Sequence, residues 1–420
     1  MLVLLPVAGF LTGCGTTGNS QAVARVQSEK PREQAPQVAE DDLTELAAGN
    51  HEFAWELYGA VRDEPGNLFY SPYSISLALA MTHAGARGQT AQEMAETLHF
   101  TLPEARLHPA FNRVTLDLVE QGDASEEKSF RLNIANALWG QKEYTFLPEF
   151  LDLLATQYGA GMRLLDFKSD SEAARKSINA WVSEQTEEKI ENLIPPGVLD
   201  ESTRLVLTNA IYFYGKWQAP FDKAQTRDGP FHLLEGGEVT VPMMHQDGSF
   251  RYGAGEGYQI IELPYAGSDM AMIVLLPAED HFQSFEESID AARVDEMVQG
   301  LEHQSMALTL PKFTYESEFA LSEALSNLGM PSAFSASQAD FSGMDGTRNL
   351  VISEVIHKAF VAVDEEGTEA AAATAVVMAE TSAMIPDLEV TVDRPFLFLI
   401  RDNATGTLLF AGRVLDPTGK

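Results

Sequence analysis

A run of small residues near the C-terminal end, residues 363–378, constrains the fold more than any other part of the chain. It reads VDEEGTEAAAATAVVM and follows a strand-like apolar segment. In an extended conformation alternate side chains share one face. That face would carry Thr368, Ala370, Ala372, Thr374, Val376 and Met378, none of them charged. Alanine has the highest helix propensity, so propensity alone favours a helix. The flanking sequence must decide between a helix and a segment that can become a strand.

The flanks and several distant segments resemble the serpin family. The matching segments are residues 67–81, 85–90, 207–217, 310–313, 356–360, 393–400 and 409–417. The resemblance extends from about Leu43 to Pro417. It implies an α+β serpin fold, with helices around three β-sheets and a mobile reactive-centre loop that can insert into the central sheet.

The resemblance also assigns roles to residues near the small-residue run. The hinge of the loop would comprise Glu365, Glu366, Gly367, Thr368, Glu369, Ala370, Ala371, Ala372 and Ala373. Each inward hinge residue must pass between two strands, where proline would delete a hydrogen-bond donor and a charge would be buried unpaired. Thr368 is neither a proline nor a charged residue, and the alanines have small side chains that fit between strands. Counting 16 positions from Glu365 places the reactive bond between Thr381 and Ser382, with Met378 and Met384 as alternatives.

A second set of residues matches the machinery that opens the sheet. Ser71, Ser74, Asn209 and His357 would form a polar cluster under the middle of the central sheet, and Trp217 would lie at the top, where the loop first enters. A buried histidine with such partners is most often a satisfied core residue. In a serpin, His357 would also bridge strands of the central sheet that have to separate when the loop inserts.

The resemblance implies a serine endopeptidase inhibitor that is a suicide substrate, not an enzyme. The partner would be a serine endopeptidase held as a covalent acyl complex. No Arg or Lys lies between Lys358 and Arg394, which favours elastase-like or subtilisin-like targets over trypsin-like ones. The alternative is a non-inhibitory serpin that acts as a surface binding module. The chain has no Gly-x-Ser-x-Gly or His-Glu-x-x-His motif, although a triad dispersed along the sequence stays open.

Composition is consistent with one large domain, predicted to span residues 41–420. Of 420 residues 45% are hydrophobic, and no Pro/Gly/Ser linker divides the chain after residue 41. The net charge of −34 argues against nucleic acid as a partner. The nine histidines are scattered and suggest no metal site, and no cofactor is expected. We expect a monomer.

The single cysteine, Cys14, follows an apolar segment and the residues Leu11, Thr12 and Gly13. This arrangement resembles the lipobox of bacterial lipoproteins. It predicts a signal peptide over residues 1–13, lipidation of Cys14, and a disordered tether over residues 14–40. The protein would then be anchored to the membrane of the cell envelope, at the outer membrane or cell surface. No Lys or Arg precedes the apolar segment, which departs from the usual signal pattern, so an uncleaved anchor and a secreted form are alternatives.

Periodicity predicts two long helices and seven strands. The helices span residues 41–61 and 173–192, and Pro195 and Pro196 would end the second. The strands span residues 131–138, 203–213, 257–263, 270–276, 306–310, 388–392 and 395–401.

Overall fold

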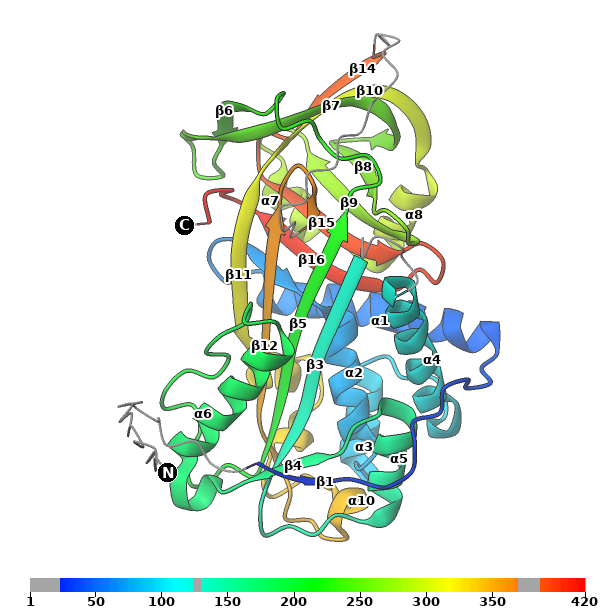
Figure 1. Cartoon of the computed structure of the whole chain (residues 1–420), viewed down its shortest axis with the longest axis vertical. Helices are drawn as coiled ribbons and strands as arrows, with labels where there is room; N and C mark the ends of the chain where they lie inside the picture. The colour runs from blue at the N-terminus through cyan, green and yellow to red at the C-terminus, as the bar shows by residue number, and fades with distance from the viewer. Residues whose placement is uncertain (1–22, 124–129, 369–385, 420) are drawn as a thin grey trace, which may run out of the picture.

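A seven-stranded sheet runs the length of the molecule in the computed structural model, which describes residues 23–123, 130–368 and 386–419. This main sheet forms the tall layer in the centre of Figure 1. Its order is β1 (Ala24–Val26), β4 (Met162–Leu165), β3 (Phe130–Gln141), β5 (Leu205–Lys216), β13 (Gly367–Thr368), β12 (Ile352–Val363) and β11 (Phe313–Ala320). β5 is buried along almost its whole length because both of its faces are covered, which explains its nearly unbroken apolar sequence.

The other strands form a second hydrogen-bonded path at one end of the molecule. Its order is β14 (Leu388–Thr391), β10 (Glu302–Pro311), β7 (Glu238–Gly255), β8 (Tyr258–Pro264), β9 (Met270–Pro277), β15 (Phe396–Asp402), β16 (Leu408–Val414) and β2 (Leu68–Tyr70), and β6 (Arg227–His232) pairs with β7. The long strand β7 pairs with β6 and β10 and, at its end, with β8. Two of the three expected sheets are therefore joined through β7.

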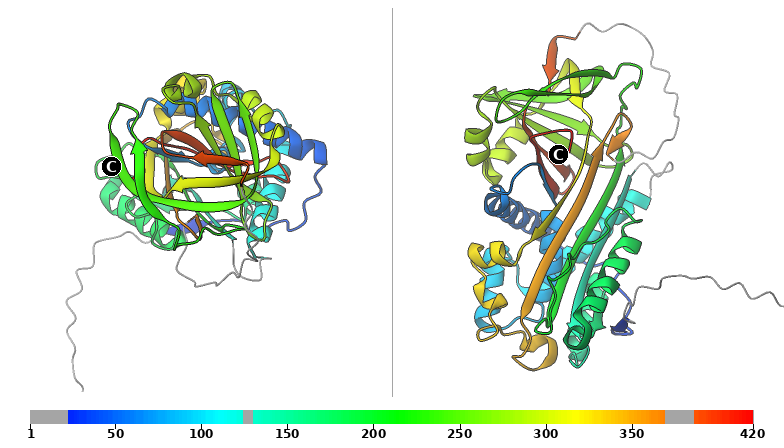
Figure 2. Two further views of the ribbon diagram at one scale, coloured as in Figure 1. Left: turned by 90° about the horizontal axis from the view of Figure 1, so that it is seen from above. Right: turned by 90° about the vertical axis from the view of Figure 1, so that its left-hand side faces the viewer.

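The helices lie on both faces of the main sheet (Figure 2). They are α1 (Glu40–Val61), α2 (Pro72–His83), α3 (Gly88–Thr97), α4 (Glu104–Asp123), α5 (Pro148–Tyr158), α6 (Phe167–Gln185), α7 (Phe282–Glu287), α8 (Ala291–Gln299), α9 (Ser322–Leu328), the 3₁₀-helix η1 (Pro331–Phe334) and α10 (Ser342–Asp345). The helix α2 lies behind β3 and β5, and α6 crosses the opposite face.

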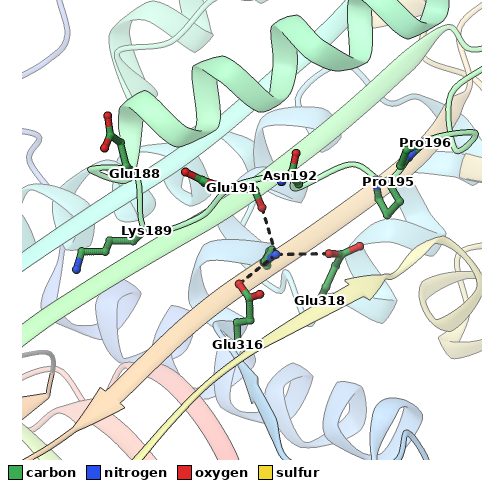
Figure 3. Close-up of a pocket in the computed structure, with 9 residues that line it drawn as sticks. Glu188, Lys189, Glu191, Asn192, Pro195, Pro196, Glu316 and Glu318 are labelled. Atoms are coloured by element: carbon green, nitrogen blue, oxygen red, sulfur yellow. Dashed lines mark hydrogen bonds and ion pairs between the residues drawn. The ribbon is translucent and has the colours of Figure 1, made fainter. Parts of the chain in front are cut away.

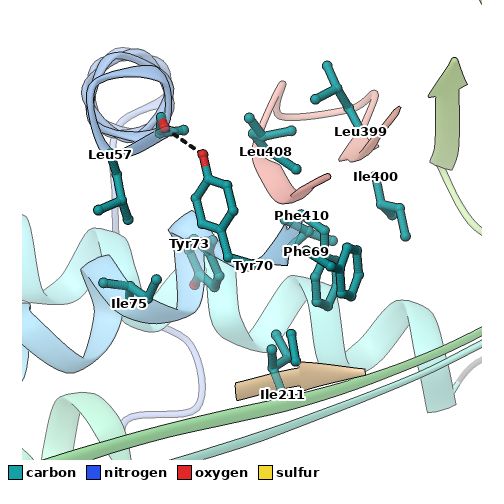
Figure 4. Packing of buried hydrophobic residues seen from close by; sticks show 14 of the residues in the cluster. Leu57, Phe69, Tyr70, Tyr73, Ile75, Ile211, Leu399, Ile400, Leu408 and Phe410 are labelled. Atoms are coloured by element: carbon teal, nitrogen blue, oxygen red, sulfur yellow. Dashed lines mark hydrogen bonds between the residues drawn. The ribbon is translucent and has the colours of Figure 1, made fainter. Parts of the chain in front are cut away.

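Every residue of α2 is buried, so its polar groups need partners inside the protein. Ser71 caps the helix by accepting a hydrogen bond from the backbone N–H of Ser74 at 3.2 Å. Beside it, aromatic and aliphatic side chains of α1, β2, β15 and β16 form the main core (Figure 4). The hydroxyl of Tyr70 donates to the carbonyl of Ala54 at 2.6 Å and thereby attaches β2 to α1.

The predicted elements agree with this fold, with two corrections. All seven predicted strands and the helix over residues 41–61 are present, whereas the helix predicted over residues 173–192 ends at Gln185, well before Pro195. It stops because Glu187 and Glu188 adopt positive φ angles of 52° and 62°, which a right-handed helix cannot accommodate.

The predicted tether is wrong for residues 23–40. Ala24–Val26 pair antiparallel with Met162–Leu164 and extend the main sheet by one strand. Further along, Asn112 of α4 accepts a hydrogen bond from Nε of Arg32 at 2.7 Å and donates one to the carbonyl of Glu33 at 2.8 Å. We call residues 23–39 the N-terminal strap. Its polar composition suggested disorder because these specific partners cannot be read from the sequence.

Candidate functional site

The upper ends of β5 and β12 are separated by two residues of the hinge. Gly367 and Thr368 form β13, in which Thr368 pairs antiparallel with Gly215 of β5 and with Val363 of β12. Below this point β5 and β12 pair directly and in parallel, from Leu205 with Ile352 to Tyr212 with Phe360. We call the boundary between β5 and β12 the seam. The sheet is thus closed along the seam and open only where the hinge enters.

Gly367 is required by its close approach to β5. A Cβ atom at this position would lie 2.0 Å from the carbonyl oxygen of Gly215 and 2.8 Å from Cα of Lys216. No side chain fits there without moving the backbone of β5.

Thr368 occupies a buried site between the two strands and is 1% exposed. Its hydroxyl lies 2.6 Å from that of Tyr265. The ring of Tyr265 stacks on Trp217, with centroids 4.8 Å apart and planes inclined by 12°. Trp217 in turn holds the hinge: its backbone N–H donates to the carbonyl of Glu366 at 2.9 Å and its Nε1 to that of Asp364 at 3.0 Å. Trp217 therefore lies beside the point where Gly367 and Thr368 pass between the two strands.

The two hinge glutamates that the structure describes, Glu365 and Glu366, have basic partners on either side of the entrance. Glu365 accepts hydrogen bonds from Nζ of Lys312 at 2.7 Å and from the hydroxyl of Thr226 at 2.8 Å, and Glu366 pairs with Lys223. Burial by itself would raise the pKa of Glu365, but the hydrogen bonds from Lys312 and Thr226 lower that pKa below its ordinary value. The hinge is therefore held in place by an ionised carboxylate.

The predicted polar cluster lies under the middle of the seam. The backbone N–H of Ser71 donates to Nε2 of His357 at 3.1 Å, so the proton of the neutral ring is on Nδ1, which donates to Oδ1 of Asn209. Asn209 lies on β5 and is the direct cross-strand partner of His357 on β12. Burial lowers the pKa of His357 to about 3, so the imidazole is neutral.

Asn136 of β3 completes the cluster and was missed in the sequence. Nδ2 of Asn209 donates to Oδ1 of Asn136 at 2.6 Å and to the hydroxyl of Ser74 at 2.7 Å. Nδ2 of Asn136 then donates to the carbonyl of Ser74 at 3.0 Å. Asn136 lies in the strand predicted over residues 131–138, and its polar side chain there is the sequence feature that could have identified it. The cluster joins α2, β3, β5 and β12 by hydrogen bonds that cross the seam.

Several predicted site residues lie outside the described residues. These are Glu369, Ala370, Ala371, Ala372 and Ala373 of the hinge, Thr381 and Ser382 of the reactive bond, the alternatives Met378 and Met384, and Cys14. Among the described residues there is no group of three or more His, Cys, Asp or Glu side chains that could hold a metal ion. Likewise, no described helix is long and apolar enough to cross a membrane.

Comparisons with known proteins define the class of protein to which this fold and site belong. The sequence model of the family described as "Serpin (serine protease inhibitor)" matches residues 48–417. The chain therefore belongs to the serpin family.

Individual relatives agree over nearly the whole length. The human leukocyte elastase inhibitor is 41% identical over 386 residues, covering 89% of this chain and 100% of that protein, and the rat leukocyte elastase inhibitor A is 42% identical over the same coverage. Among solved structures, the thermophilic serpin tengpin in its native state has a TM-score of 0.82 at 29% identity, covering 93% of this chain and 99% of that one. Uncleaved ovalbumin has a TM-score of 0.79 at 30% identity, covering 89% and 100%. The human and rat relatives give no support to the predicted bacterial lipoprotein.

Proposed function

We infer that this serpin inhibits serine endopeptidases as a suicide substrate. A protease would attack the reactive bond and form an acyl-enzyme, and the freed loop would then insert along the seam and carry the protease with it. The state of the hinge supports this most directly. Thr368 is already paired antiparallel with both β5 and β12, while the two strands below it still pair in parallel.

The pairing pattern also supplies a driving force. Each inserted residue would replace one parallel pairing by two antiparallel ones, which are slightly more stable per residue. If about a dozen residues gain ladder hydrogen bonds at about 0.5–1.5 kcal/mol each, insertion releases on the order of 10 kcal/mol. This is comparable to the stability of a typical domain and is sufficient to distort a tethered protease.

We propose elastase-like or subtilisin-like proteases as targets. The segment between Lys358 and Arg394 contains no basic residue, and the small or medium apolar residues Ala379, Ala383 and Met384 lie near Thr381. Such a sequence suits a shallow or hydrophobic specificity pocket. The name of the human relative, leukocyte elastase inhibitor, agrees with this proposal. The alternative, a non-inhibitory binding module, has less support, because Gly367 and Thr368 fit the seam without steric or polar obstacles.

On the sequence alone we also propose that Cys14 is lipidated and anchors the protein to a bacterial cell envelope. The described domain begins at the N-terminal strap, so the tether would be limited to the residues between Cys14 and Val23. Mass spectrometry of the membrane fraction would detect the acyl groups on Cys14. An unmodified Cys14 in soluble protein would contradict the anchor without affecting the proposed inhibition.

The function is tested by incubating the chain from Val23 onward with pancreatic elastase and, separately, with subtilisin. We expect a band at the summed mass that resists denaturant, and a released C-terminal peptide that begins at Ser382. Trypsin, whose acidic specificity pocket requires a basic residue before the cleaved bond, is the control and should give no such band. Cleavage in the loop by elastase and subtilisin without a denaturant-resistant band would favour the non-inhibitory alternative.

A further inference from the structure

Two arginines lie next to each other at the lower end of the main sheet, on strands β1 and β4 (Figure 1). Arg25, in the N-terminal strap, is the direct cross-strand partner of Arg163. Side chains of such a pair project from the same face of a sheet, with Cβ atoms about 5 Å apart. Like charges in this arrangement repel each other, so the pair is unfavourable unless another group neutralises it.

Arg163 is held in place by two tryptophans. Its guanidinium carbon lies 4.3 Å from the ring centroid of Trp181 on α6 and 5.5 Å from that of Trp139 on β3. The two indoles meet edge to face, with centroids 5.4 Å apart. A guanidinium that contacts aromatic rings through its face keeps its N–H donors, which lie in its plane, free to bind a ligand. The protein therefore orients Arg163 without using its hydrogen-bond donors.

The strap holds Arg25 opposite this position. A Cβ atom at Gly161, just before β4, would lie 2.7 Å from the carbonyl oxygen of Val26, so only glycine leaves room for the strap here. Beyond β1, Nζ of Lys30 pairs with Asp152 of α5 at 2.8 Å. These contacts on both sides of β1 keep Arg25 in register with β4.

Elsewhere on the same face of the sheet a basic side chain has acidic partners. Lys358 of β12 lies beside a hollow of about 620 Å³ and pairs there with Glu316 at 3.1 Å and Glu318 at 3.7 Å (Figure 3). Arg25 and Arg163 differ, because no carboxylate within the described part of the chain lies at ion-pair distance from either guanidinium. With 62 acidic against 28 basic residues, the chain has many carboxylates, yet none is placed at this pair.

The surroundings of Arg163 also disfavour an isolated positive charge. Burial lowers the pKa of Arg163 below its ordinary value, and the charge of Arg25 lowers that pKa further, while Glu184 on α6 opposes the shift. Arginine nevertheless stays protonated in proteins. The two strands therefore present two adjacent positive charges, one on an exposed side chain and one on a half-buried side chain.

We propose that Arg25 and Arg163 form a binding site for a phosphate group. Guanidinium groups bind phosphate oxygens with two parallel hydrogen bonds. A phosphate monoester carries about 1.5 to 2 negative charges at pH 7, which matches two arginines, whereas a carboxylate would offset only one of them. The site lies at the edge of the sheet and uses no residue of the hinge or the polar cluster. It is therefore independent of the proposed inhibition.

Two sources offer this chemistry, the headgroup of a membrane lipid and a soluble phosphate ester. The headgroup source rests on the proposed lipid anchor. Residues 14–22 would span at most about 30 Å if fully extended, so an anchored Cys14 would bring Arg25 within reach of the membrane surface. The net charge of −34 opposes approach to an anionic membrane, so the two sources are tested separately.

The test measures the binding of glycerol 3-phosphate to the full chain by isothermal titration calorimetry, at constant ionic strength in chloride buffer. The fluorescence of Trp139 and Trp181 reports on the surroundings of Arg163 in a parallel titration. The variants are Arg25→Gln and Arg163→Gln. The control Arg227→Gln removes an exposed arginine of β6, at the other end of the molecule. Acetate replaces the phosphate ester as a ligand with a single charge.

Arg25→Gln and Arg163→Gln should each weaken the binding of glycerol 3-phosphate about tenfold or more, as expected for the loss of charged hydrogen bonds. Arg227→Gln should bind like the wild type, and acetate should bind at least about tenfold more weakly than the ester. Arg25 is exposed, so Arg25→Gln should fold normally, which thermal unfolding verifies. Absence of binding by the wild type, or equal binding by all four proteins, would overturn the site.

Vesicles separate the two sources of phosphate. Phosphatidic acid has a phosphate monoester as its headgroup and is mixed into phosphatidylcholine vesicles. Sedimentation of the full chain with these vesicles, but not with pure phosphatidylcholine, and its loss in Arg25→Gln would assign a lipid headgroup. Binding of glycerol 3-phosphate without sedimentation would assign a soluble ester. Absence of protease trapping, or of lipid on Cys14, bears on the proposed function and leaves these binding constants unchanged.

Discussion

The hydroxyl of Thr368 lies 2.6 Å from that of Tyr265. At this point Thr368 lies between β5 and β12 and pairs with Gly215 on one side and Val363 on the other. Under the proposed function, this contact is the point from which the reactive loop would enter the main sheet. All further entry would follow the seam between β5 and β12, past the polar cluster on one face of the sheet.

Replacing Thr368 with arginine should convert the inhibitor into a substrate. The site is 1% exposed, so a guanidinium there would be buried without a charge partner. We expect normal cleavage of the loop and loss of the denaturant-resistant complex, measured on denaturing gels with elastase. The control Thr240→Arg changes an exposed threonine on β7 and should leave trapping intact. Undiminished trapping by Thr368→Arg would refute the path of insertion.

Replacing His357 with alanine should loosen the closed sheet. The change leaves the backbone N–H of Ser71 and the side-chain Oδ1 of Asn209 without the His357 ring as partner, at a cost of about 2–4 kcal/mol. The expected result is lower inhibitory efficiency or faster polymer formation, followed by size-exclusion chromatography at elevated temperature. His303→Ala, which alters an exposed residue, is the control. Unchanged kinetics and monomer lifetime would exclude this role for the cluster.

Mild acid should destabilise the protein through its buried histidines. Burial lowers the pKa of His357 and of His108 to about 3, whereas an unfolded histidine titrates near 6.5. The unfolded state therefore binds more protons between these values, and stability falls as the pH drops below about 6.5. At pH 5 each histidine should cost about 2 kcal/mol. Urea unfolding at pH 7 and pH 5 measures this loss, which His357→Gln should reduce by about 2 kcal/mol. An equal loss in the variant would show that His357 does not contribute.

Loss of the N-terminal strap should destabilise the domain. Asn112 hydrogen-bonds to both Arg32 and Glu33, so Asn112→Ala should cost about 1–3 kcal/mol in the free energy of unfolding. Removal of residues 1–39 should have at least the same effect, whereas removal of residues 1–22 should have little. The measurement is the thermal unfolding midpoint of Asn112→Ala and of the two truncated chains, each compared with that of the intact chain. Equal midpoints would mean that the strap adds no stability.

The sequence predicted the strands and the seam residues better than it predicted local backbone geometry. Ser71, Ser74, Asn209 and His357 are brought together as expected, because they lie in segments that resemble the family motifs. Asn136 was missed because its role depends on the register between β3 and β5. The early end of α6 follows from positive φ angles at Glu187 and Glu188, which no residue-type preference indicated. The strap depends on partners in α4 and β4 that are distant in sequence.

The central claim is that a cleaved reactive loop inserts between β5 and β12. The most direct measurement compares the thermal unfolding of the intact chain with that of the same chain cleaved once in the loop by subtilisin and purified. Insertion of about a dozen residues should raise the midpoint by at least about 10 °C. An unchanged or lower midpoint after a single cleavage in the loop would show that the loop does not enter the sheet, and would contradict this account.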